Sequence, residues 1–230
     1  MKKIIVFIFT NLFVVTTIFS QNFSIGAKYA GNSTWLLNKQ VSVEDNQSYS
    51  MSFGHDFGII THFKFSDYVG MKAEILANTT NQKYTGLDSL AVNYENYLKL
   101  QTLDIPIFMT FGNKFYVEVG YIISVLNKAN QELSINNFKT YDDVKANFSQ
   151  VNQSVSLGLV KCFEFGEGFR FLIGVRAAKG IKDIQGVNAF GLTKTEIEEM
   201  EQALGEDCNS ENFSTKSLTV GAYFGLTMEL

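Results

Sequence analysis

Stretches of alternating apolar and polar residues recur from Phe23 to Leu230, separated by connections that are in turn long and very short. Alternation with a period of two is the pattern of a β-strand with one apolar face. A barrel that crosses an outer membrane has tight turns on its periplasmic side and long loops on its outer side. We therefore predict an all-β fold: an eight-stranded antiparallel up-and-down transmembrane β-barrel with long extracellular loops and short periplasmic turns.

The predicted strands have one face suited to lipid and another suited to a small, crowded interior. The clearest is the last, where Leu218, Val220, Ala222 and every second residue to Leu230 are apolar or small. The alternating segments are 23–29, 57–65, 69–77, 103–111, 115–125, 155–159, 169–178 and 218–230. The chain is 46% hydrophobic and 14% aromatic with one proline, which is unusual for a secreted soluble domain. Strands that face lipid would account for this excess.

The connections fall into two classes. The short ones are rich in the small and polar residues that tight turns require, and they are Ser66–Asp67, Gly112–Lys114 and Gly166–Gly168. The long ones are rich in Asn, Gln, Ser, Thr and charge, and they are Gly31–Ser52, Asn78–Glu95, Asn127–Ser149 and Lys182–Ser217. If the mature N-terminus lies in the periplasm, an even number of strands places every long segment outside the cell.

The first twenty residues resemble a secretory signal peptide. Met1, Lys2 and Lys3 form a positive segment, Ile4 to Phe19 is mostly apolar, and Ser20 provides a small residue for cleavage. An uncleaved membrane anchor would need a longer and more apolar stretch. We predict a signal peptide over 1–20, a barrel domain over 21–230, and export to the outer membrane.

Nine charged residues fall on the inward face of the predicted strands. They are Lys28, Lys64, Lys72, Glu74, Asp104, Glu118, Arg170, Arg176 and Glu229. They would form either a proton or solute path, or a structural network of ion pairs and hydrogen bonds. An eight-stranded barrel holds only its own side chains or one small ligand, so we favour the structural network and expect no open pore.

Pro106 is the single proline and lies within a predicted strand. Because proline cannot donate to a strand ladder, we expect a bulge or a local break in pairing there. The alternation also suggests a change of phase between Leu100 and Leu103.

A short acidic helix is predicted in the last long segment, over about 196–204. Thr195 and Glu198 have the spacing of a capping box, and Ile197, Met200 and Leu204 recur at helical intervals. The helix could be a docking surface or a lid packed on the barrel mouth, and we favour the lid.

Candidate catalytic residues are few. His55 and His62 share one strand, and Asp56 follows His55. A histidine base needs an orienting carboxylate and a positioned nucleophile or water, whereas neighbouring strand residues point to opposite faces. We therefore expect no enzymatic activity.

Metal, cofactor and nucleic-acid sites are not indicated either. Cys162 and Cys208 have no metal-binding spacing, and their predicted places are too far apart for a disulfide, which needs Cα atoms within about 7 Å. Phosphate-binding glycine loops are absent, and a net charge of −4 disfavours nucleic acid. The expected surroundings are outer-membrane lipid, and a monomer is plausible.

The sequence resembles the PorT-like outer-membrane β-barrel family of Bacteroidetes. The resemblance rests on Phe23–Lys28 (FSIGAK), Met71–Leu76 (MKAEIL), Leu103–Pro106 (LDIP) and Phe115–Tyr121 (FYVEVGY), and it covers essentially the whole mature chain. The chain departs from the usual aromatic C-terminus of outer-membrane barrels, since its last residue is Leu230.

The resemblance implies a non-enzymatic, structural or surface-interaction role, with secretion or gliding machinery or other surface proteins contacting the outer loops. It supplies no catalytic motif. Two alternatives stay open at this point: a soluble secreted β-barrel that binds a small apolar ligand, and a lipid-modifying barrel enzyme. The first would bury the apolar strand faces, and the second needs a nucleophile and a base at one rim.

Overall fold

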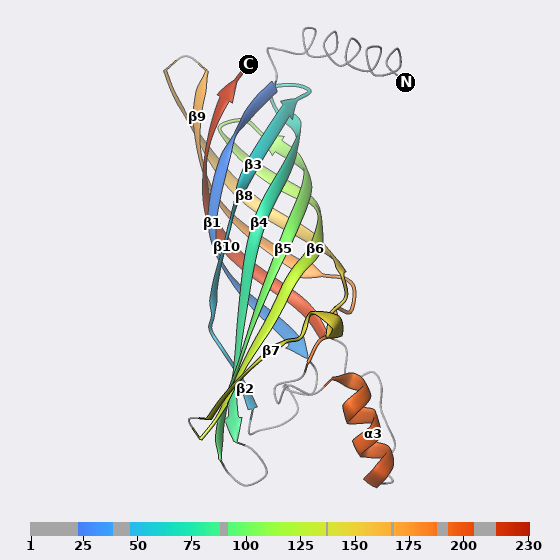
Figure 1. Cartoon of the computed structure of the whole chain (residues 1–230). Coiled ribbons are helices and arrows are strands. Elements are labelled where there is room, and N and C mark those ends of the chain that lie inside the picture. The colour runs from blue at the N-terminus through green and yellow to red at the C-terminus, as the bar shows by residue number, and fades with distance from the viewer. Residues whose placement is uncertain are drawn as a thin grey trace, which may run out of the picture.

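The computed structural model describes residues 23–38, 47–87, 92–136, 138–166, 168–187, 193–204 and 215–230 (Figure 1). Its strands are β1 (Phe23–Asn38), β2 (Gln47–Ser50), β3 (Phe53–Lys64), β4 (Val69–Leu87), β5 (Asn93–Gly112), β6 (Phe115–Ile135), β7 (Phe138–Asp143), β8 (Val151–Phe165), β9 (Phe169–Gly180) and β10 (Thr215–Glu229). A short 3₁₀ helix (Lys145–Asn147) precedes β8, and helix α3 (Lys194–Leu204) precedes β10.

Eight of these strands close into a ring, as predicted. Strands β1, β3, β4, β5, β6, β8, β9 and β10 each pair antiparallel with the ring neighbours before and after them. The ring closes where β1 meets β10, from Ser24 opposite Glu229 to Asn38 opposite Thr215. Closure removes the free edges that an open sheet would present.

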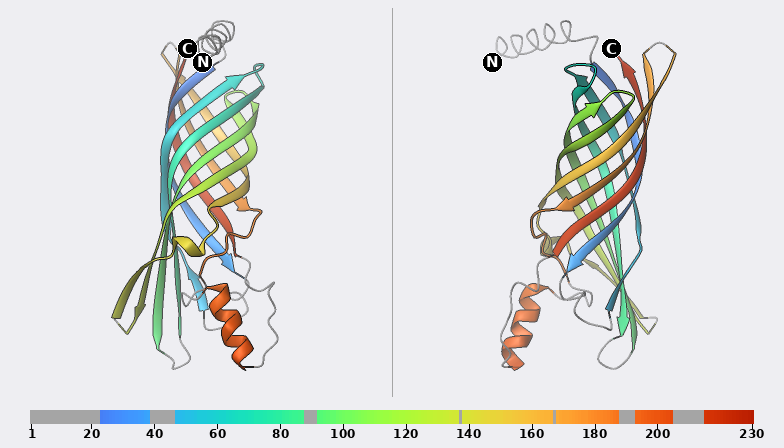
Figure 2. Two further views of the ribbon diagram at one scale, coloured as in Figure 1. Left: turned by 45° about the vertical axis from the view of Figure 1, so that its right-hand side comes forward. Right: turned by 180° about the vertical axis from the view of Figure 1, so that it is seen from behind.

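Both ends of the described chain lie at one end of the barrel, called here the terminal end (Figures 1 and 2). The three tight turns lie at the same end, because each joins a strand that ends there to a strand that begins there. Gly112, Gly166 and Gly168 have positive φ angles of 127°, 62° and 81°, a region that favours glycine. The opposite end is called the distal end, and it carries the longer connections and α3.

The apolar strand faces point outward. Large apolar side chains on every ring strand are about half exposed, including Phe57 at 56%, Ile75 at 58% and Leu157 at 55%. On β5 the outward apolar run is Leu103 to Phe111, which matches the nine to eleven residues that a tilted strand needs to cross a bilayer. This outward arrangement is opposite to what a soluble barrel with a buried apolar face requires.

The terminal end of this apolar band is ringed by phenylalanines. Its exposed members include Phe65, Phe111, Phe115, Phe165 and Phe169, and Phe165 stacks with Phe169 at 6.0 Å between ring centroids. Aromatic girdles mark the interface of transmembrane barrels. The described residues include no helix that is long and apolar enough to cross a membrane.

The predicted local break in pairing at Pro106 is confirmed, whereas the predicted change of phase in β5 is wrong. β5 keeps its phase, since Leu100 and Asp104 both point inward. The bulge is instead in β6, where Gln101 pairs with Lys128 and Thr102 with Leu126. Near Pro106 the pairing of β4 with β5 is interrupted without a change of register, because proline has no N–H to donate.

Strands β4, β5 and β6 are longer than predicted, at 19, 20 and 21 residues. Much of the predicted loops Asn78–Glu95 and Asn127–Ser149 is therefore strand. Beyond the apolar band these strands continue as a projecting sheet flanked by β2 and β7, in the order β2-β4-β5-β6-β7 (Figure 2). We call this projection the distal sheet, consisting of β2, β7 and the segments 79–87, 93–101 and 127–135.

The distal strands were not predicted because their outward positions are polar, whereas those of the membrane-facing strand segments are apolar. On β4, Thr79, Asn81 and Lys83 occupy outward positions and are partly exposed, while Gln82 and Tyr84 point inward and are fully buried. A strand prediction that relies on apolar residues at every second position does not detect such a segment. The period of two is still present in it.

Helix α3 begins earlier than predicted and has a different cap. Thr193 and Glu196 form the capping box: the Thr193 N–H and hydroxyl donate to Glu196 Oε2, and the Glu196 N–H donates to the Thr193 hydroxyl. These hydrogen bonds hold the pKa of Glu196 below its usual value. The predicted signal peptide over 1–20 and Cys208 lie outside the described residues, while Cys162 is a free, buried thiol.

Candidate functional site

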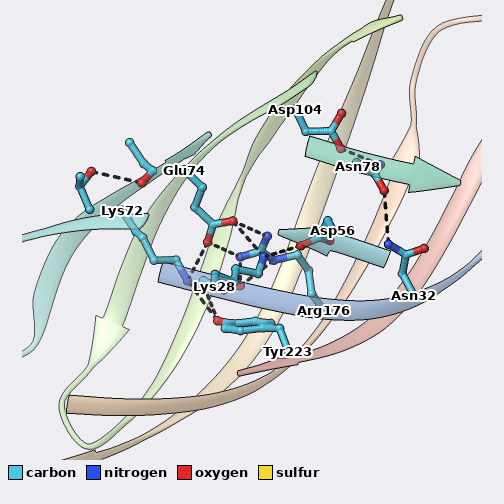
Figure 3. Close-up of polar contacts among 12 residues, drawn as sticks. Lys28, Asn32, Asp56, Lys72, Glu74, Asn78, Asp104, Arg176 and Tyr223 are labelled. Atoms are coloured by element: carbon cyan, nitrogen blue, oxygen red, sulfur yellow. Dashed lines mark hydrogen bonds and ion pairs between the residues drawn. The ribbon is translucent and has the colours of Figure 1, made fainter. Parts of the chain in front are cut away.

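The middle of the lumen is filled by a group of charged and aromatic side chains. We call this set the lumen plug; its members are Lys28, Asp56, Lys72, Glu74, Glu118, Arg176 and Tyr223 (Figure 3). All come from inward positions of strands β1, β3, β4, β6, β9 and β10. Three members are cations and three are carboxylates, so their formal charges balance.

Glu74 is the first of two almost fully buried carboxylates of the plug. Arg176 donates to both of its oxygens, at 2.9 and 2.8 Å, and Lys28 Nζ donates to Oε2 at 3.0 Å. Paired hydrogen bonds between a guanidinium and a carboxylate combine charge attraction with fixed geometry. Glu74 is thereby held in place although it is only 1% exposed.

Glu118 is the second buried carboxylate of the plug. It pairs with Lys72, accepts from Arg176 Nε at 2.8 Å, and accepts from the Tyr223 hydroxyl at 3.1 Å. The Arg176 guanidinium also lies 4.1 Å from the centre of the Phe108 ring, a favourable cation–π position. These contacts fill the lumen cross-section with side chains.

Two inward glycines make room for the plug. A Cβ on Gly158 would lie 2.5 Å from Glu118 Oε1, and one on Gly174 would lie 2.5 Å from the Tyr223 ring. Both positions therefore need glycine because a buried side chain approaches the backbone closely.

The other predicted inward charges lie on either side of the plug. Toward the distal end, Asp104 accepts from Asn78 Nδ2 at 2.9 Å and from Thr102 Oγ1 at 2.7 Å. At the terminal end, Arg170 pairs with Glu229 at 2.5 Å. Lys64 lines a small cavity beside Arg170. The structure thus brings five of the nine predicted residues together and places four elsewhere in the lumen.

Sequence reasoning missed several members of this arrangement. Alternation placed Tyr223 and Phe108 on the inward face, but only the closed ring shows that they contact the charged cluster. Asp56 was considered only as a partner for His55. Inward glycines opposite charged strand positions were the available signal for a crowded lumen.

The histidines do not form a catalytic arrangement with Asp56. His55 is on the outer face, stacked with Tyr29, whereas Asp56 points inward to Lys28. His62 points inward near the terminal end and contacts the Thr110 hydroxyl at 2.9 Å. Among the described residues, no group of three or more His, Cys, Asp or Glu is placed to hold a metal ion.

The distal sheet packs its inner face against the end of β1. Gln82 Oε1 accepts from the Leu36 N–H at 3.0 Å, and the Tyr84 hydroxyl donates to the Leu36 carbonyl at 3.1 Å. The β1–β3 ladder ends at Ser33, so these two side chains replace the missing backbone partners on this side of β1. An apolar cluster that includes Leu98 and Tyr94 surrounds them.

Replacing Gln82 by alanine should leave the buried Leu36 N–H without its acceptor. We expect a loss of about 1–3 kcal/mol, the usual cost of an unsatisfied buried polar group. Amide hydrogen exchange should show faster exchange at Leu36. Thr85→Ala, which removes only an exposed hydroxyl contact with Ser48, is the control, and an equal effect of both changes would contradict this role of Gln82.

The outer face of the distal sheet is polar. Lys83 pairs with Glu95 at 2.8 Å, and Lys139 donates to Glu132 at 2.5 Å. The hydrogen bond from Lys139 to Glu132 raises the pKa of the lysine. Burial, and secondarily the nearby Glu132 charge, raises the pKa of Tyr97. Such a face suits water rather than lipid.

The comparison with known proteins finds solved structures that resemble this chain at low sequence identity. No family model matches the chain, and no curated protein does. Among solved structures, the neisserial surface protein NspA has 10% identity and a TM-score of 0.39 over 90% of this chain and 97% of its own. Ail, the attachment invasion locus protein of Yersinia pestis, has 10% identity and a TM-score of 0.38 over 90% and 99%. The outer membrane protease OmpT from Escherichia coli has 4% identity and a TM-score of 0.44 over 92% and 97%.

Proposed function

We propose that this protein is a non-enzymatic outer-membrane barrel whose distal sheet is a binding surface for another protein of the cell envelope. The observation that carries the proposal is the distal sheet itself: strands continue well past the apolar band and end in a flanking strand. The lumen plug supports the same view, because side chains rather than an aqueous channel occupy the middle of the barrel.

Strand β7 is the part of the distal sheet best suited to bind a partner. In the described part of the chain it pairs with β6 alone, so its other edge presents backbone N–H and C=O groups. Its six residues are all exposed, with Phe138 at 80% and Tyr141 at 69%. An exposed strand edge with adjacent aromatic side chains is a template for adding an extended segment of another chain.

The kind of partner is a further part of the proposal. The resemblance to PorT-like proteins supports a component of a secretion or gliding apparatus. Export through a cleaved signal peptide and residence in the outer membrane are parts of the same proposal. The outward apolar band with its phenylalanine girdle supports the residence in the membrane.

Site-specific photo-crosslinking in native membranes tests the binding surface. A photoreactive residue at Tyr141 should give a discrete adduct, and Phe138→Asp should abolish it. A photoreactive residue at Tyr68, an exposed tyrosine at the terminal end, is the matched control. An adduct from Tyr68 but not from Tyr141, or one that Phe138→Asp leaves unchanged, would contradict the proposed surface.

The identity of the crosslinked protein then tests the finer proposal. A component of a secretion or gliding apparatus would support the PorT-like role. An adduct with an unrelated surface protein would contradict that role while leaving the binding surface in place.

A further inference from the structure

The distal half of the lumen contains a cavity of about 120 Å³ between the plug and the barrel mouth. Lys28, Asp56 and Arg176 of the plug line one end of it, and Phe148 and Ile184 line the other. The two roofing segments are joined by hydrogen bonds from the Ser149 N–H to the Ile184 carbonyl and from the Gly186 N–H to the Asn147 carbonyl, both 2.9 Å. The roof is therefore an ordered part of the barrel mouth.

The cavity has a polar wall and an apolar roof. Asn32, Asn78 and Asp104 lie together on the polar wall (Figure 3). Leu36, Leu100 and Leu126 line the cavity close to Phe148 and belong to the apolar cluster of the mouth. Pockets for small organic molecules combine these two features, since apolar lining supplies affinity and a few polar groups fix orientation.

Asp104 gives the polar wall a carboxyl group that has no positive partner. The residue is 9% exposed, and its carboxyl accepts hydrogen bonds from the neutral groups of Asn78 and Thr102. Within the described residues, no lysine, arginine or histidine lies within ion-pair distance of it. The plug cannot neutralise Asp104, because its own three cations are matched by Asp56, Glu74 and Glu118. A buried carboxylate is costly without a positive partner.

The same wall has an excess of hydrogen-bond acceptors. Asn32 is 5% exposed, and its buried Oδ1 has no hydrogen-bond partner. Asp56 Oδ1 also accepts no hydrogen bond, with its nearest cation, Lys28 Nζ, at 3.8 Å. A buried acceptor without a donor costs free energy, so this wall suits an occupant that donates hydrogen bonds and carries positive charge.

We propose that this cavity binds a small organic amine in its ammonium form. The ammonium group donates to Asp104, and a short apolar group lies beneath Phe148 and Ile184. An engineered cavity of about 150 Å³ accepts benzene, so the ligand is of about that size or smaller. A bare metal ion would leave the apolar roof without a partner, because such ions prefer oxygen on all sides.

Titration of the folded, detergent-solubilised protein with n-butylamine, followed by calorimetry, tests the proposal. We expect saturable binding that weakens at least tenfold in Asp104→Asn, a change that retains hydrogen-bonding capacity but removes the charge. 1-Butanol, which has the same apolar chain without the charge, should bind at least tenfold more weakly to the unaltered protein. Glu95→Gln, at an exposed carboxylate of the distal sheet, is the control and should leave binding unchanged.

A second variant keeps the test independent of the folding of Asp104→Asn. Ala178 lines the cavity, so Ala178→Leu should fill part of it and abolish n-butylamine binding while the carboxylate stays intact. Binding that survives both Asp104→Asn and Ala178→Leu would overturn the proposal. So would equal affinities for n-butylamine and 1-butanol, or saturable binding of sodium ions without any binding of n-butylamine.

Discussion

Replacing Glu118 by alanine should destabilise the folded barrel by about 3–5 kcal/mol, the range for removing one partner of a buried ion pair. Glu118 is fully buried and contacts Lys72, Arg176 and Tyr223. Its loss leaves three cations of the plug against two carboxylates. Urea unfolding in lipid vesicles, with the folded fraction read from the mobility of unheated samples on gels, measures the change.

Two controls separate the loss of charge from the loss of any glutamate. Glu95→Ala removes an exposed partner of Lys83 and should cost no more than about 1 kcal/mol. The double variant Lys72→Met with Glu118→Leu removes a positive and a negative charge together, and it should be more stable than Glu118→Ala alone. A double variant no more stable than Glu118→Ala would show that packing, rather than charge balance, sets the cost.

Arginine in place of Ile107 should cost about 2–4 kcal/mol in lipid vesicles, the range for a charge at the bilayer midplane on the lipid face. Ile107 is 47% exposed and lies at the centre of the outward apolar run of β5, Leu103 to Phe111. The same unfolding assay measures this loss.

Asn93→Arg is the matched control because Asn93 lies on the same strand, in the distal sheet. Its effect should be close to zero if that sheet stands in water. Equal losses from the two substitutions, or a barrel that stays folded and soluble without detergent, would contradict the membrane-spanning assignment of the apolar band.

The ring and its faces could be predicted from the sequence because both follow from local alternation. In a strand, the side to which a residue points depends only on its place in the period of two. Lipid on the outside selects large apolar residues at every second position, as in Leu103 to Phe111, while turn chemistry marks the terminal end. The same reasoning placed Lys28, Glu74 and Arg176 inward before any contact among them was known.

Three features could not be read correctly in this way. The bulge of β6 was assigned to β5 because one extra residue changes the relative register of both strands, and the sequence does not show which strand contains it. The distal sheet was taken for loops because its outward residues face water and are polar. The cap of α3 was placed at Thr195 because two overlapping Thr-x-x-Glu spacings occur, and only the backbone conformation distinguishes Thr193–Glu196 from Thr195–Glu198.

Fold, orientation of strand faces and the inward position of the charges were thus determined by the sequence alone. The tertiary structure decided which charges meet, because ring closure brings Lys28 to Glu74 across 46 positions and Arg176 to Glu74 across 102. It also decided that Asp104 remains outside the balanced plug, facing a cavity. Such partnerships depend on the tilt and stagger of all the ring strands together, which no single strand specifies.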